Sequence, residues 1–141
     1  MKNKNLPADD NWATPKWFYN QLNAEFNFDF DPCPYNEGEI LKCGLLAKWG
    51  ARNFINPPYN RKIKEQFVLK AIEVAKAGAV CVLLLPVSTS TKIFHEAIKP
   101  NAKDIRFIKG RIKFQKRDAS GEWFTPKNGG MHDSMIVVFG L

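Results

Sequence analysis

Apolar and polar positions follow two different periods along this chain, one typical of helices and one typical of strands. Apolar side chains recur every three or four residues in three segments, so we predict helices at residues 15–25, 64–77 and 91–98. Thr14 and Pro15 supply a start signal for the first helix, with Thr14 as the N-cap and Pro15 at the first helical position. Segments with a different pattern separate these helices.

Strands are predicted between and after the helices. Phenylalanines alternate with polar residues over residues 26–31, which indicates a first strand that ends at Pro32. Residues 52–55 form a short second strand, and the unbroken apolar run at residues 80–85 is typical of a parallel strand covered on both faces. Two further β-rich segments and the long loop between them complete the chain: residues 105–114, 134–139 and 115–133.

The order of these elements predicts an α/β protein with three layers. Strands that alternate with helices favour a mainly parallel sheet, and the closing β-rich segments predict an antiparallel last strand. A length of 141 residues indicates a single domain, residues 1–141, in which residues 1–11 are expected to be flexible. Residues 38–49 are compatible with a short helix interrupted by Gly44. In such sheets, ligands bind beyond the carboxyl ends of the strands.

The composition narrows the class of protein and of partner. Lys and Arg number 21 against 14 Asp and Glu, and the formal charge of +7 favours a polyanion such as nucleic acid. A membrane surface and mere solubility are alternative reasons for this charge, although no basic amphipathic helix with a bulky apolar face stands out. Residues 1–10 are polar and the longest apolar run, residues 77–86, is too short to cross a bilayer, so a cytoplasmic protein is expected.

The cysteines indicate neither a disulfide framework nor a metal site. Cys33, Cys43 and Cys81 are odd in number and lack the spacing of a zinc site, so we predict reduced thiols. Cys33 is expected to be a packed small residue rather than a nucleophile, because no His or Lys lies near it in the sequence to lower its pKa.

The most specific signal is Asn56-Pro57-Pro58-Tyr59, which directly follows the second predicted strand. Two prolines remove two backbone donors, so nearby carbonyls stay available as acceptors, and Asn56 adds a side-chain carbonyl. Converging acceptors of this kind can bind both hydrogens of an exocyclic amine and free its lone pair, while Tyr59 offers a ring on which a flipped base can stack. The alternative interpretation is a proline-rich turn with Tyr59 as a core aromatic.

Asn-Pro-Pro-Tyr is the signature of S-adenosylmethionine-dependent amino-methyltransferases, and the chain from Trp12 to Phe139 resembles the phage-type (Dam-like) DNA adenine-N6 methyltransferases. Besides the tetrapeptide, the resemblance rests on Trp12-Ala13-Thr14-Pro15, Phe28-Asp29-Phe30-Asp31-Pro32-Cys33, Asn36, Leu83-Leu84-Leu85-Pro86, and residues 108–114 and 134–139. It implies a compact Rossmann-like methyltransferase fold and transfer of a methyl group from S-adenosylmethionine to the N6 amine of adenine in DNA. Asn56 Oδ1 and the Pro57 carbonyl would hold the amine in line with the methyl group. The predicted catalytic residues are Asn56, Pro57, Pro58 and Tyr59.

The resemblance also implies where S-adenosylmethionine binds. Asp31 would meet the ammonium group of the cofactor, and the helix start at Thr14 would offer backbone donors to its carboxylate. The predicted cofactor residues are Trp12, Thr14, Asp31, Pro32, Cys33 and Asn56. No glycine-rich cofactor loop follows the first strand, so the ribose contact stays open between Glu37, Glu39 and neither, and Asn36 is expected to cap a turn.

Basic residues near these motifs predict the surface that faces DNA. The predicted DNA contacts are Arg61, Lys62, Lys64, Lys109, Arg111, Lys113, Lys116 and Arg117. Trp123, Phe124 and His132 extend this rim in the long loop, which is expected to supply base contacts. An ordinary solvated face is the alternative for individual members of the set. Neither His95 nor His132 has the partner pattern of a catalytic group.

Other functions stay open on the sequence. Asn-Pro-Pro-Tyr also occurs in enzymes that methylate a glutamine side chain, and cytosine N4 and RNA adenine are further amine substrates. Outside enzymes, the alternative is a basic DNA-binding module that keeps the methyltransferase fold without activity. The small size and the incomplete cofactor motifs favour that alternative.

Overall fold

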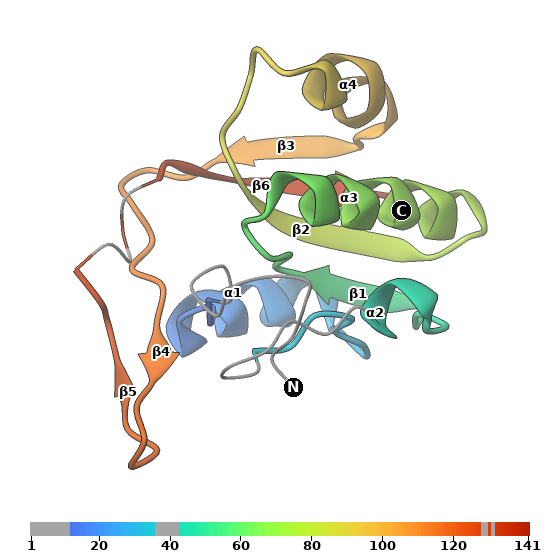
Figure 1. Cartoon of the computed structure of the whole chain (residues 1–141). Helices are drawn as coiled ribbons and strands as arrows, with labels where there is room; N and C mark the ends of the chain where they lie inside the picture. Colours follow the sequence, from blue (N-terminus) through green and yellow to red (C-terminus); the bar gives the residue numbers. More distant parts are fainter. Residues whose placement is uncertain (1–11, 36–42, 128–129, 131) are drawn as a thin grey trace.

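The computed structural model describes residues 12–35, 43–127, 130 and 132–141 (Figure 1). Within these residues the helices are α1 (Lys16–Phe26), α2 (Cys43–Leu46), α3 (Arg61–Lys76) and α4 (Lys99–Asn101), with a π-helical turn, η2 (Phe94–Ile98), directly before α4. The strands are β1 (Arg52–Ile55), β2 (Val80–Pro86), β3 (Asp104–Phe107), β4 (Lys116–Arg117), β5 (Trp123–Phe124) and β6 (Ser134–Phe139). The chain is mixed α/β, with a four-stranded sheet and a separate two-stranded hairpin in the described part.

The four-stranded sheet has the order β1-β2-β6-β3. β1 pairs with β2 in parallel, whereas β6 pairs antiparallel with both β2 and β3. The predicted antiparallel last strand is confirmed, but the mainly parallel sheet is not, because two of the three pairings within this described four-stranded sheet are antiparallel. The physical reason is the position of β6. It lies between β2 and β3 and runs opposite to both, so this single strand makes two of the pairings antiparallel.

Helices cover both faces of this sheet and give three layers (Figure 1). Side chains along a strand point alternately to the two faces. On β2, Leu83 packs in the cluster that contains Phe67 of α3, whereas Val82 packs in the cluster that contains Phe18 of α1. These four side chains are at most 5% exposed, and each such burial stabilises the fold by about 1.5 to 3 kcal/mol. The strands are therefore a firmly packed support for the loops at their ends.

The start of α1 differs from the prediction. Thr14 is not its N-cap: Pro15 occupies the cap position, and no side chain caps the helix. The Thr14 hydroxyl is engaged elsewhere, with Asn56. At the other end, α1 stops at Phe26 because Asn27 takes a left-handed conformation with φ 54°.

The predicted strand at residues 26–31 is mostly wrong. Phe26 belongs to α1, and Phe30 alone in this segment pairs with a strand, through a parallel bridge to Asn53 of β1. The Phe30 N–H donates to the Arg52 carbonyl at 3.3 Å. Phe28 packs against Tyr19 and Phe26 of α1, whereas Phe30 packs with the cluster that contains Phe67 of α3, so the segment forms no sheet ladder beyond this bridge. The single bridge still has a consequence, because it places Asp31 beside β1.

Two other boundaries shift for local reasons. α3 begins at Arg61 rather than at residue 64, because the Asn60 side chain accepts a hydrogen bond from the Ile63 N–H at 3.2 Å and caps the helix. The helix predicted at residues 91–98 continues through η2 and α4. No helix in the described part of the chain is long and apolar enough to span a membrane.

The predicted β-rich segment at residues 105–114 is a strand only in β3. Beyond it the chain bends at residues 109–110 and makes no further strand pairing within the described residues until the bridge at Gln115. The buried side chains of Ile112 and Phe114 alternate with exposed basic ones. The predicted loop at residues 115–133 contains the β4–β5 hairpin, which projects from the body of the molecule (Figure 1). Of residues 38–49, helix α2 lies in the described part; residues 1–11 and 36–42, including Asn36, Glu37 and Glu39, lie outside it.

Candidate active site

Three segments that are distant in the sequence meet at the carboxyl end of β1. Asn56-Pro57-Pro58-Tyr59 directly follows this strand. Residues 12–14 contact Asn56 through hydrogen bonds, and the backbone N–H of Asn56 faces the thiol of Cys33. The structure therefore brings the predicted catalytic residues and the predicted cofactor segments into one place.

The Asn56 amide group is oriented by two hydrogen bonds. Its Nδ2 donates to the Trp12 carbonyl oxygen at 3.2 Å and to Thr14 Oγ1 at 3.0 Å. A backbone carbonyl can only accept, so the nitrogen must face Trp12 and the Oδ1 must face away. No donor among the described residues reaches this Oδ1. Asn56 thus presents a fixed, available acceptor.

The two prolines add a second acceptor beside it. Pro57 and Pro58 are buried, and neither has an N–H to donate. Within the described residues, no N–H donates to the Pro57 carbonyl oxygen. Asn56 Oδ1 and the Pro57 carbonyl are thus two neighbouring acceptors in the sequence that have no donor among the described residues.

Tyr59 is half-buried in an aromatic group. Its ring is stacked with Trp12 at a centroid distance of 6.1 Å, and it meets Phe114 and His132 edge to face at 6.0 and 5.5 Å. Burial raises the pKa of the Tyr59 hydroxyl far above its usual value. Trp12 therefore already covers part of the Tyr59 ring on which a base would stack.

Asp31 is an unusual carboxylate for its surroundings. Burial raises its pKa from 3.8 to about 6, even though its Oδ1 accepts a hydrogen bond from the Cys33 N–H at 2.9 Å. No Lys or Arg among the described residues forms an ion pair with it. Burial and the Asp31 charge together raise the pKa of the Tyr19 hydroxyl. The described part of the site lacks a positive charge where this carboxylate lies.

Cys33 and Pro32 are structural parts of this turn. Burial raises the pKa of the Cys33 thiol well above its usual value, so the thiolate is disfavoured. Cys33 and Cys81 are free thiols. The Pro32 carbonyl oxygen packs so closely against Gly44 of α2 that a Cβ at Gly44 would overlap it. Gly44 therefore permits the approach of α2 that supports the turn at Asp31.

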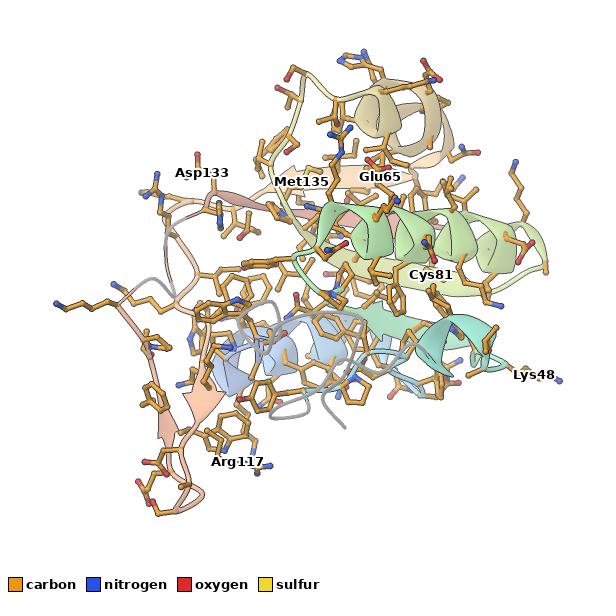
Figure 2. The ribbon with its side chains drawn as sticks, viewed as in Figure 1. Lys48, Glu65, Cys81, Arg117, Asp133 and Met135 are labelled. Atoms are coloured by element: carbon orange, nitrogen blue, oxygen red, sulfur yellow. The ribbon has the colours of Figure 1, made fainter. Side chains whose placement is uncertain are left out.

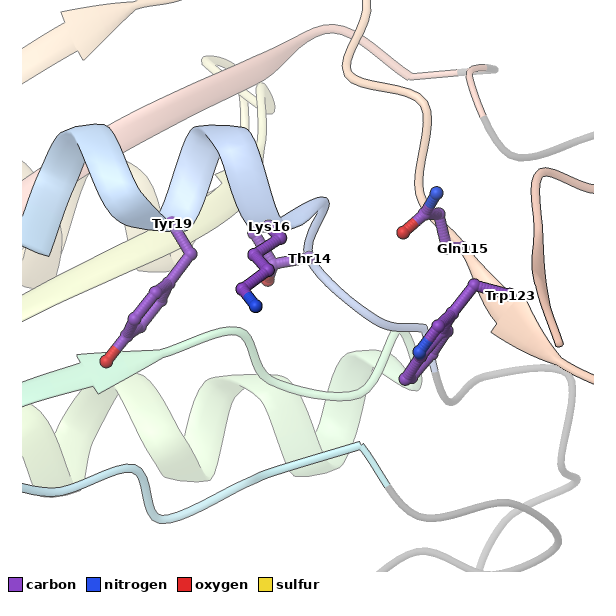
Figure 3. A pocket seen from close by; sticks show the side chains of 5 residues that line it. All are labelled: Thr14, Lys16, Tyr19, Gln115 and Trp123. Atoms are coloured by element: carbon purple, nitrogen blue, oxygen red, sulfur yellow. The ribbon is translucent and has the colours of Figure 1, made fainter. Parts of the chain in front are cut away.

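An open pocket of about 570 Å³ lies beside the tip (Figure 3). Its described lining comprises Thr14, Lys16, Tyr19, Gln115 and Trp123. Lys16 and Tyr19 approach from α1, and Gln115 and Trp123 approach from the opposite side (Figure 3). Lys16, Tyr19 and Gln115 are not among the site residues predicted from the sequence. Lys16 and Tyr19 follow the Thr14-Pro15 signal at helical spacing, which is the signal that could have found them.

The predicted DNA-contacting residues fall into separate groups. Lys116 and Arg117 lie on β4: Lys116 Nζ is 4.3 Å from the ring centroid of Trp12, and Arg117 Cζ is 4.9 Å from that of Trp123. Figure 2 shows Arg117 on the projecting hairpin. Both cations are therefore close to the aromatic residues of the site.

The other basic residues are less concentrated. Arg61 pairs with Glu65 at 3.3 Å and Arg111 pairs with Asp133 at 3.1 Å. Lys64 is half-buried, and burial lowers its pKa. The remaining predicted contacts, Lys62, Lys109 and Lys113, are exposed.

Neither histidine occupies a catalytic geometry with a described carboxylate. His95 Nε2 is 2.6 Å from the Thr89 carbonyl oxygen, away from the tip. His132 lies against Tyr59. No group of three or more His, Cys, Asp or Glu in the described ranges is placed to hold a metal ion.

Comparison with known proteins agrees with this arrangement. The family model described as DNA N-6-adenine-methyltransferase (Dam) matches residues 2–140. A DNA N-6-adenine-methyltransferase of Haemophilus phage HP1 (strain HP1c1) is 34% identical, over 92% of this chain and 78% of the relative. The match includes every segment that converges on Asn56, from Trp12 to Gln115. The chain belongs to the DNA N-6-adenine-methyltransferase (Dam) family.

Proposed function

We propose that this protein transfers a methyl group from S-adenosylmethionine to the N6 amine of adenine in DNA, and that Asn56 holds the amine. Family membership supports the reaction and the substrate. The observation that carries the role of Asn56 is its amide orientation, which leaves Oδ1 available at the end of β1.

The catalytic contribution of the chain is mainly positional. Asn56 Oδ1 and the Pro57 carbonyl accept the two amine hydrogens, which draws the nitrogen lone pair out of conjugation with the base. Tyr59, supported by Trp12, stacks against the flipped adenine. The amine becomes acidic once it is alkylated, so its proton leaves to these acceptors or to water without a dedicated base.

The residues present fit a cofactor that has an ammonium and a carboxylate group. Asp31 is a half-buried carboxylate with no described cationic partner, so a bound ammonium would lower its raised pKa. Lys16 and the uncapped start of α1 offer positive charge and free N–H groups to a carboxylate. S-adenosylmethionine, when bound, supplies an activated methyl group on a sulfonium.

Trp12, Pro32 and Cys33 would border the cofactor rather than bind it through charge. Trp12 and Pro32 are buried next to the tip, and the Cys33 N–H is already bonded to Asp31. The assignment of the ribose to Glu37 or Glu39 stays a prediction on residues outside the described part. We also propose a Rossmann-like arrangement of the sheet, since β1 and β2 are parallel and the candidate site lies beyond the carboxyl end of β1.

DNA is expected to approach over the β4–β5 hairpin and the tip. The net charge of +7 favours phosphate contacts, and Lys116, Arg117 and Trp123 lie nearest the site. Arg61 and Arg111 are partly neutralised by their carboxylate partners, so we assign them smaller contributions.

The test is to express the protein in a host that lacks DNA methylation and to analyse the genomic nucleosides by mass spectrometry. We expect N6-methyladenine from the wild type and a far lower level from Asn56→Ala. N4-methylcytosine instead would change the substrate. Absence of both, with salt-dependent DNA binding retained, would favour the inactive DNA-binding module.

A further inference from the structure

The segment at residues 12–14 is clamped between two parts of the fold. On one side, Ala13 and Gln115 exchange backbone hydrogen bonds at 2.9 and 3.0 Å in an antiparallel bridge. On the other side, the Trp12 carbonyl and the Thr14 hydroxyl accept the two hydrogens of the Asn56 amide. Trp12 and Ala13 are buried. The acceptors that face Asn56 are thus fixed by the fold before any substrate arrives.

Thr14 lies just before the start of α1, where its hydroxyl could accept an N–H of the first turn, yet it does not cap the helix. A threonine just before a helix commonly accepts an N–H of the first turn. Here no side chain caps α1, and the Thr14 hydroxyl binds Asn56 at 3.0 Å, the shorter of the two Asn56 contacts. The hydroxyl is therefore diverted from helix capping to the amide of Asn56.

We infer that Thr14 is a positioning residue for methyl transfer, which holds the Asn56 amide so that its Oδ1 faces the substrate amine. This inference rests on the proposed role of Asn56. Without the Thr14 hydroxyl, one hydrogen of the Asn56 amide loses its acceptor. The remaining hydrogen bond to the Trp12 carbonyl restricts rotation of the amide less than the two hydrogen bonds do together. The acceptor is then present but misaligned for part of the time, which lowers turnover rather than DNA affinity.

A double-mutant cycle tests whether Thr14 acts through Asn56. Thr14→Val removes the hydroxyl at nearly constant volume, and Thr14→Ser keeps it. We measure kcat and the KM for DNA at saturating S-adenosylmethionine, and the KM for S-adenosylmethionine in a separate titration at saturating DNA, because Thr14 also lines the pocket. Thr14→Val should lower kcat about 10-fold with little change in the KM for DNA, and Thr14→Ser should restore kcat. In an Asn56→Ala background, Thr14→Val should cause no further loss.

A second readout does not depend on activity. With ¹⁵N-labelled asparagine, the side-chain amide hydrogens of Asn56 should exchange more slowly than those of exposed Asn20, and this protection should fall in Thr14→Val. The Asn56→Ala spectrum assigns the signal. If Thr14→Val fails to fold by circular dichroism, Thr14→Ala replaces it in both measurements.

The outcomes separate this inference from the proposed function. Equal losses from Thr14→Val in both backgrounds, unchanged kcat, an effect on the KM for S-adenosylmethionine alone, or fast exchange at Asn56 in the wild type would each overturn the role of Thr14. Wild-type turnover by Asn56→Ala would overturn the catalytic assignment itself. Low turnover by Asn56→Ala with normal turnover by Thr14→Val overturns the Thr14 inference and leaves the proposed function standing.

Discussion

Replacing Asp31 with asparagine should stabilise the protein without cofactor while weakening cofactor binding. Burial raises the pKa of the carboxyl from 3.8 to about 6, which corresponds to about 3 kcal/mol at roughly 1.4 kcal/mol for each tenfold change in proton affinity. Because Asp31 is only half-buried, solvent screening reduces the expected gain to about 1 to 2 kcal/mol. Asparagine keeps an Oδ1 acceptor for the Cys33 N–H.

The sign of the pH dependence follows from the raised pKa. Between pH 3.8 and about 6, the folded protein holds the Asp31 proton more tightly than the unfolded chain does, so this group's contribution to stability falls as pH rises through that window. The Asp31→Asn variant lacks this fall. Its advantage over the wild type should be near zero below the window and complete above it, as measured by urea denaturation at a series of pH values.

Asp29→Asn is the matched control, since Asp29 is on the same segment but is exposed and paired with Arg52 at 3.7 Å. Loss of that surface pair should change stability by about 0 to 1 kcal/mol, in the destabilising direction. Calorimetry should show that Asp31→Asn weakens S-adenosylmethionine binding by about 1.5 to 3 kcal/mol. Equal stability of Asp31→Asn and wild type at neutral pH would refute the burial argument, and unchanged calorimetric affinity would refute the ammonium assignment.

Three further outcomes are expected. Asn56→Ala should keep cofactor affinity but lower methyl transfer by about two to three orders of magnitude, as measured with radiolabelled methyl donor; wild-type turnover would remove the central assignment. Gly44→Ala should lower the free energy of unfolding in urea by about 1 to 3 kcal/mol, because the new methyl group overlaps the Pro32 carbonyl; an unchanged midpoint would show that α2 shifts freely. Replacing Lys116 and Arg117 with glutamine should lower the slope of log K against log salt by about 0.9 for each DNA phosphate that the variant no longer neutralises, and an unchanged slope would place the DNA elsewhere.

Hydrophobic periodicity correctly predicts the elements in which buried side chains follow a regular pattern. The continuous apolar run of β2 and the amphipathic pattern of α3 are correct, because each follows directly from which faces are covered. The prediction for the segment around Phe28 is wrong because aromatic alternation also arises when a loop packs against a helix, as Phe28 does against Phe26 of α1. The interior position of β6 is a property of pairing between distant segments, which local pattern does not encode.

The candidate site divides in the same way. Asn56 and Asp31 can be predicted from the sequence because each belongs to a short motif of consecutive residues whose side chains suggest a chemical role. The roles of Thr14 and Gln115 depend on contacts across the chain: the sequence predicts Thr14 as a helix cap, and its hydroxyl binds Asn56 instead. Lys16 is one of many basic residues in the sequence, and its helical spacing from Tyr19 after Thr14-Pro15 is the one signal that sets it apart.

The interior place of β6 also has a consequence for the order in which the molecule can assemble. β2 and β3 are made before β6, yet each pairs with it rather than with the other. As the nascent chain emerges from the ribosome, the edge of β2 stays open until residue 139 has left the exit tunnel. Long-range pairing of this kind slows folding, and open apolar edges invite aggregation. Expression at reduced temperature or with chaperones should therefore raise the yield of folded protein more than changes near the catalytic tip do.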